Sequence, residues 1–237
     1  MDLGLDGRVA VIGASSKGLG LATAQALSAE GARVVLNGRD PDALAEAAAS
    51  LPGEHVVVPG DIVDPATPQT LVDAALSAWG RLDVVVGNAG GPPRARALEV
   101  EDDAARAAFE ANCLASIRLA TTAVPHLRER GWGRICFITS AAVRQPIPGL
   151  ALSNIARAGL WAWAKTAAQD LADAGITVNL ACPGQHPTER LAGQPIEGRT
   201  GDVAGFGRVV AFLCSEPAAF VNGVALGVDG GSVAGLL

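Results

Sequence analysis

The chain has 237 residues, a formal net charge of −6 and 49% hydrophobic residues, so it can bury a substantial core as one large domain or two small ones. No stretch is basic enough to indicate a nucleic-acid partner, no apolar run reaches the length of a membrane span, and the opening MDLGLDGR carries no signal pattern. The four cysteines are scattered without a CxxC pair, which favours free thiols in a reducing compartment. We therefore expect a cytoplasmic protein that binds no nucleic acid, no membrane and no metal.

Short apolar runs alternate with helical patterns along the whole chain. Buried-strand patterns cover 8–12, 32–36, 55–58, 82–86, 134–139, 176–180 and 224–228. Helical patterns cover 19–31, 41–50, 67–79, 102–130, 152–174 and 203–214. Pro125 is expected to kink the long helix or to mark its last turns. Because the strands are apolar throughout, both of their faces should be covered. The sequence predicts a single α/β domain over 1–237, with a seven-stranded parallel sheet and helices on both faces.

A glycine-rich stretch, 13–20 (GASSKGLG), separates the first strand from the first helix. Such a turn places backbone N–H groups at a helix N-terminus, where they suit a pyrophosphate, although glycines alone also fit an ordinary tight turn. Other motifs follow the later strands. They are Asp61, Asn88-Ala89-Gly90, Ser140, Pro183-Gly184 and Val228-Asp229-Gly230-Gly231, with Asn112 inside the long helix.

Together these motifs resemble the classical short-chain dehydrogenase/reductase family over nearly the whole chain. The resemblance implies a Rossmann-type sheet, a nicotinamide cofactor, a small-molecule carbonyl or alcohol substrate, and a homo-oligomer (tetramer or dimer) packed through the two long helices. One departure is at Gly13-Ala14, where the family usually has Thr-Gly. The methyl group of Ala14 narrows the space between the loop and the cofactor but need not block binding. By position, the resemblance places these residues at the cofactor: Gly13, Ser16, Lys17, Gly18, Leu19, Gly20, Arg39, Asp61, Ile62, Asn88, Ala89, Gly90, Arg157, Pro183, Gly184 and Thr188.

The residues after the second strand favour NADP(H) over NAD(H). Gly38 stands where an NAD-dependent relative carries an acid for the ribose hydroxyls. Arg39 and Lys17 are cations suited to a 2′-phosphate, which arginine can bind bidentately. The alternative is that both are solvated surface charges. Asp61 is expected to face the adenine and Asn88 to order the turn beneath the ribose, and a plain turn-forming role stays open for both.

The catalytic positions depart from the family pattern. Asn112 and Ser140 match the family's relay asparagine and carbonyl-binding serine. The family's tyrosine falls on Ser153 and its lysine on Arg157, and the chain contains no tyrosine. A phenol has a pKa of about 10, whereas an aliphatic hydroxyl starts several units higher and is no competent base at neutral pH. Arg157 shares a helix face with Ser153, but it stays protonated and cannot shuttle protons. We expect the groups needed for hydride transfer to be intact and those needed for proton transfer to be altered.

His186 is the sequence's best replacement for the tyrosine, because it follows Pro183-Gly184-Gln185 and an imidazole titrates near neutral pH. The alternative is that its side chain points to solvent. His55 and His126 are expected outside the site. The substrate loop, about 185–202, is shorter than the family's usual lid and leaves the site open or lets another subunit cover it.

Three functions remain open from the sequence. The first is an NADP(H)-dependent carbonyl reductase or alcohol dehydrogenase with a modified proton relay, 3-oxoacyl reductase-like by family resemblance alone. The second is a non-catalytic NADP(H)-binding sensor or assembly protein, which the missing tyrosine favours. The third is a non-redox, dehalogenase-like enzyme, since that group resembles this family and has an arginine where Arg157 stands.

Overall fold

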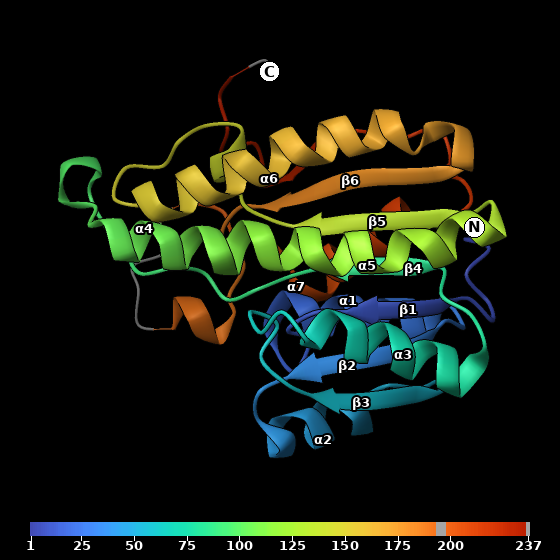
Figure 1. The fold of residues 1–237 in the computed structure, drawn as a ribbon. Coiled ribbons are helices and arrows are strands. Elements are labelled where there is room, and N and C mark those ends of the chain that lie inside the picture. Colours follow the sequence, from blue (N-terminus) through green and yellow to red (C-terminus); the bar gives the residue numbers. More distant parts are fainter. Residues whose placement is uncertain (193–197, 236–237) are drawn as a thin grey trace.

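A computed structural model describes residues 1–192 and 198–235. Within these residues, seven parallel strands form one sheet in the order β3-β2-β1-β4-β5-β6-β7, with helices on both faces (Figure 1). The strands are β1 Val9–Ile12, β2 Arg33–Gly38, β3 His55–Pro59, β4 Val84–Gly87, β5 Gly133–Ile138, β6 Ile176–Pro183 and β7 Ala225–Val228. The fold class predicted from the alternating apolar and helical patterns is confirmed.

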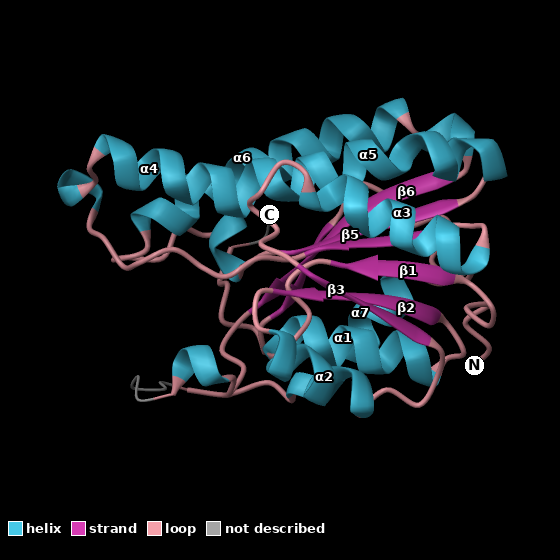
Figure 2. Ribbon diagram, turned by 60° about the horizontal axis from the view of Figure 1, so that its bottom comes forward, coloured by secondary structure: helices cyan, strands magenta, loops and turns pink. Residues whose placement is uncertain are grey.

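Two helical layers cover the sheet and bury one core on each side. Figure 2 shows α1 (Gly18–Ala29), α2 (Pro41–Ala49) and α7 (Val203–Leu213) on one face. The other face carries α3 (Thr67–Trp79), α4 (Asp102–Phe109), α5 (Ala115–Arg130) and α6 (Ala151–Asp170). Strand side chains alternate between the two cores, as Ile12 packs with the α1 layer and Val11 with the α5 layer. Both faces are therefore apolar, which explains why the strand patterns are continuous rather than alternating.

The predicted helix over 102–130 is one long helical path with a widened turn. A π-helical turn at Glu110–Leu114 joins α4 to α5, and Asn112 lies in this turn with its side chain buried. Such turns insert an extra residue and often mark functional sites, because they re-aim the side chains that they carry. Pro125 lies inside α5 rather than at its end.

Short 3₁₀ turns complete the chain at Ala97–Glu99, Ala141–Val143, Ala172–Ala174 and Glu189–Leu191. The last of these lies in the predicted substrate loop, about 185–202, of which residues 193–197 lie outside the described residues. In the described part of the chain, no helix combines the length and apolar character needed to cross a membrane.

Candidate active site

A cleft of about 1470 Å³ opens at the carboxyl ends of the strands. The strand order reverses direction between β1 and β4, and the crevice beside such a switch point is where parallel α/β sheets bind ligands. The glycine-rich loop and the ends of β2, β3 and β4 line one half of the cleft. Ser140, Ser153, Arg157 and the chain after β6 line the other half. One cavity therefore joins the two groups of residues that the sequence singled out.

The glycine-rich loop presents the start of α1 to this cleft. The N-cap of α1 is Lys17, and among the described residues no capping side chain accepts the first N–H groups of the helix. Those N–H groups lie among cleft-lining residues 16–19 and carry the positive end of the helix dipole. This uncapped terminus fits a pyrophosphate. Ala14 adopts a left-handed backbone with φ of 45°, which is costly for a residue with a side chain.

Two buried or half-buried asparagines hold the loop in shape. The Oδ1 of Asn37 accepts the Ala14 N–H at 3.1 Å, and its Nδ2 donates to carbonyl oxygens at the end of β3. The Nδ2 of Asn88 donates to the carbonyl of Ala14 at 3.0 Å. A Cβ at Gly20 would lie 2.6 Å from that same carbonyl, so only glycine fits there. Asn88 therefore orders the turn. Asn37 orders it as well, although no sequence pattern predicted a role for Asn37.

The end of the cleft beside β2 carries two basic side chains, Arg39 and Lys17. A Cβ at Gly38 would stand 3.0 Å from the Oγ of Ser16, so a carboxylate side chain has no room there unless Ser16 moves. Arg39 is 81% exposed and lies 3.9 Å from a carboxylate oxygen of Asp61. Lys17 is 67% exposed and donates to Glu189 at 2.7 Å. Both cations are thus surface groups paired with acids, and both can rotate toward a phosphate at little cost.

The other half of the cleft ends at the buried guanidinium of Arg157. Its Nε donates to the Oγ of Ser153 at 3.2 Å and its Nη2 to the Oδ1 of Asn112 at 2.9 Å. Its Nη1 donates to the carbonyl of Ile138 at 3.1 Å, which ties α6 to the end of β5. Ser153, Arg157 and Asn112 are each at most 5% exposed. The π-helical turn and α6 thus bring together three of the predicted catalytic residues.

Two hydroxyl groups lie at this end of the cleft with their protons available. The Oγ of Ser140 accepts the Ala142 N–H at 3.1 Å, and the Oγ of Ser153 accepts from Arg157. Each oxygen uses a lone pair in that bond, so each O–H remains to donate to a ligand. Nearby, the Nδ2 of Asn112 has no hydrogen-bond partner among the described residues. The two hydroxyl donors, Ser140 and Ser153, suit a ligand oxygen that gains negative charge.

His186 is buried rather than directed to solvent, so the alternative considered from the sequence is wrong. The ring is 4% exposed and packs edge-on against Phe206 of α7, with centroids 5.2 Å apart. Its Nδ1 lies 3.3 Å from the carbonyl of Gly184, and its Nε2 would be 2.3 Å from a Cβ at Gly201. Both ring nitrogens therefore face the protein. A catalytic role for His186 stays a prediction, and this packing disfavours it.

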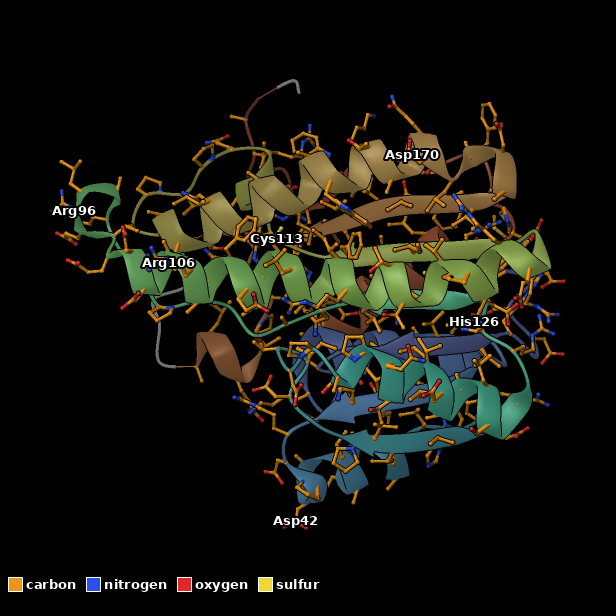
Figure 3. All side chains as sticks on the ribbon, viewed as in Figure 1. Asp42, Arg96, Arg106, Cys113, His126 and Asp170 are labelled. Atoms are coloured by element: carbon orange, nitrogen blue, oxygen red, sulfur yellow. The ribbon has the colours of Figure 1, made fainter. Side chains whose placement is uncertain are left out.

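The predicted site residues divide into those that line the cleft and those that support it. The lining residues are Ser16, Lys17, Gly18, Leu19, Arg39, Asp61, Ile62, Asn88, Ala89, Gly90, Ser140, Ser153, Arg157, Pro183, Gly184, His186 and Thr188. Gly13, Gly20 and Asn112 lie behind this wall. Thr188 covers the glycine-rich loop, since its Cγ2 would be 3.6 Å from a Cβ at Gly18. His55 is exposed at the start of β3, and Figure 3 shows His126 near the end of α5 remote from α4.

A family model described as Enoyl-(Acyl carrier protein) reductase matches residues 13–233. The chain belongs to the short-chain dehydrogenase/reductase family. It is 34% identical to a 3-oxoacyl-[acyl-carrier-protein] reductase of Synechocystis sp., over 97% of this chain and 98% of that protein. It is 30% identical to dehydrogenase/reductase SDR family member 4 of Bos taurus, over 98% and 89% of the two chains. The structure of L-sorbose reductase from Gluconobacter frateurii, complexed with NADPH and L-sorbose, superposes with a TM-score of 0.92 at 31% identity over the whole of both chains.

Membership of the short-chain dehydrogenase/reductase family supports a nicotinamide cofactor, and the uncapped start of α1 fits the pyrophosphate of one. The same membership supports a small-molecule substrate.

Proposed function

We propose that the protein is an NADP(H)-dependent oxidoreductase that reduces a carbonyl group or oxidises the corresponding alcohol with an altered proton relay. A bound nicotinamide cofactor supplies or accepts the hydride. The observation that carries the proposal is the single cleft that joins the uncapped N-terminus of α1 to the hydroxyls of Ser140 and Ser153. A dinucleotide needs the first feature and a reacting oxygen needs the second.

Ser140, Ser153 and Arg157, here called the catalytic corner, bind and polarise the substrate oxygen rather than exchange a proton with it. Ser140 and Ser153 donate hydrogen bonds to that oxygen, and Arg157 stabilises negative charge through its bond to Ser153. Arg157 stays protonated, so it holds its proton throughout. We infer that the proton comes from water in the cleft. Turnover is therefore expected to be slow compared with relatives that have a positioned acid.

We propose NADP(H) rather than NAD(H). A Cβ at Gly38 would stand only 3.0 Å from the Oγ of Ser16, which crowds a ribose-binding carboxylate there, while Arg39 and Lys17 lie at the same end of the cleft. The L-sorbose reductase structure, which contains NADPH, supports this assignment by similarity. The expected cost of removing Arg39 is that of one charge-assisted bond at an exposed site, about 1.4 kcal/mol or tenfold in affinity.

Titrations of intrinsic tryptophan fluorescence with NADPH and NADH test this proposal. The Arg39→Ala variant should lose NADPH affinity and keep its NADH affinity. The control is Arg33→Ala, because Arg33 is a half-buried arginine at the start of β2, the strand that Arg39 follows, and it pairs with Glu54 outside the cleft. If the wild type binds NADH as well as NADPH, or if both variants behave alike, the phosphate assignment is wrong.

The absence of a tyrosine also favours a second candidate, a non-catalytic NADP(H)-binding protein. A broad panel of carbonyls and alcohols, followed by NADPH absorbance, separates the two. NADPH binding without turnover of any compound would favour the second candidate.

We also propose that copies of the chain associate. Phe109 on α4 and Ile155 on α6 are exposed apolar residues, at 37% and 54%, on helices that lie side by side in Figures 1 and 2. The four cysteines are all buried and unbridged, which supports a reducing, cytoplasmic location.

A further inference from the structure

The substrate half of the cleft is positively charged although the protein is acidic. Its charged lining residues are Arg94, Arg157, Arg199, Asp229 and Glu189, whereas the whole chain carries a net charge of −6. The cations proposed for the cofactor, Lys17 and Arg39, belong to the other half. An excess of one sign in a cleft concentrates ligands of the opposite sign there.

Both carboxylates of this region are already engaged, and Glu189 accepts from Lys17 at 2.7 Å. Asp229 follows β7 and accepts hydrogen bonds from the N–H groups of Gly231 and Val233, each at 3.1 Å, and from the hydroxyl of Ser232 at 3.4 Å. Three donors of its own turn therefore offset its charge. Within 1–192 and 198–235, neither Arg94 nor Arg199 forms an ion pair. The two arginines thus present charge to the cleft.

The backbone fixes Arg94 at the rim beside the helix that carries Ser153. The neighbouring residue, Ala95, bridges to Leu150 as an isolated parallel pair. The Ala95 N–H donates to Gly149 at 3.0 Å, and the Ala151 N–H donates to Ala95 at 3.1 Å. Gly149 has a φ of 75° and no side chain, and a Cβ there would lie 3.7 Å from the Nη2 of Arg94. The guanidinium therefore lies against the chain that leads into α6. A ligand that binds Arg94 there has little side-chain freedom to immobilise.

We propose, resting on the proposed function, that the substrate is an oxo acid or the corresponding hydroxy acid. Its carboxylate binds Arg94, with Arg199 adding charge from the rim beside Gly230, while its carbonyl oxygen lies at Ser140 and Ser153. Arginine suits this role because its planar N–H pair matches the two oxygens of a carboxylate. The reacting group and the recognised group then use separate residues, so recognition can be removed without touching the catalytic corner.

The test measures binding to the NADPH-loaded protein by calorimetry, independent of turnover. The probes are 2-, 3- and 4-oxo acids, each paired with its uncharged methyl ester. At least one acid should bind about tenfold more tightly than its ester, and this preference should weaken as salt is raised. Arg94→Ala should reduce the preference to nearly one. The control is Arg96→Ala, two residues along the same segment, because Arg96 is exposed, lies outside the cleft lining and projects from the end of the molecule in Figure 3.

The outcomes separate this inference from the function beneath it. No NADPH binding by the wild type would overturn the proposed function. Normal NADPH binding with equal affinity for acids and esters would overturn the oxo-acid assignment alone. So would a preference for an uncharged 3-oxoacyl thioester, or an acid preference that Arg94→Ala and Arg96→Ala affect equally. Loss of the preference in Arg94→Ala only, with NADPH affinity unchanged, supports the assignment.

Discussion

If the proposed function holds, replacing Ser153 with tyrosine should raise the rate of carbonyl reduction. Ser153 lines the cleft, so an added aromatic ring extends into open space rather than into the core. The Nε of Arg157 lies 3.2 Å from the Ser153 oxygen, so a phenol built at this position remains close to a permanent cation. A cation at this range lowers the pKa of the new phenol from about 10 toward neutrality. The variant thereby gains a proton donor that the wild type lacks.

The size of the gain follows from general acid catalysis. A positioned acid contributes about 10²- to 10⁴-fold, which corresponds to about 3–5 kcal/mol of barrier. The assay is NADPH consumption with a carbonyl panel, and kcat should acquire a pH dependence that falls as the phenol ionises. The matched control is Ser153→Phe, which fills the same space without a hydroxyl. A second variant, Ser153→Tyr with Arg157→Lys, restores both of the family's residues.

Equal activity of the tyrosine and phenylalanine variants would refute this reasoning, provided that both bind NADPH as the wild type does. The proton supply would then not limit turnover. A loss of NADPH binding in both variants would show instead that the ring fills the cofactor's own space. That result would contradict the placement of Ser153 at the substrate end.

Three further predictions concern stability. Ala14→Gly should raise the free energy of unfolding, measured by urea denaturation, by about 0.5–1 kcal/mol. Relief of the strained left-handed backbone at this position outweighs the extra conformational freedom that glycine gives to the unfolded chain. An unchanged urea midpoint would contradict this. Burial alone would raise the pKa of Asp83, but bonds from Arg81, Arg8 and the Val9 N–H hold it below its usual value. The contribution of the Asp83 carboxylate to stability is therefore present above pH about 4 and is lost as the pH falls through the lower folded pKa. Asp83→Asn should cost about 3 kcal/mol of stability at pH 7 and progressively less in acid. A cost that does not change with pH would refute this direction of the pH dependence. His186→Ala should lower stability by about 2–3 kcal/mol and leave the pH profile of kcat unchanged, whereas an altered profile would restore the catalytic role for this ring.

The sequence determined the architecture because its signals are local and repeated. Continuous apolar runs separated by helical patterns require a parallel sheet covered on both faces, and the structure has that sheet. The placement of the site at one edge also followed, since all parallel strands end there. The common face of Ser153 and Arg157 was likewise visible, because a four-residue spacing on a helix places two side chains side by side, and the two are hydrogen-bonded.

Only the tertiary structure decided which side chains point into the cleft. His186 is next to the predicted site in sequence, yet Phe206 of α7 packs against its ring, and no local pattern predicts that contact. Asn37 and Arg94 received no role from the sequence, because their function depends on partners at Ala14 and Gly149, which lie 23 and 55 residues away along the chain. Side-chain direction is set by packing between distant segments, whereas strand and helix formation is set by the order of neighbouring residues.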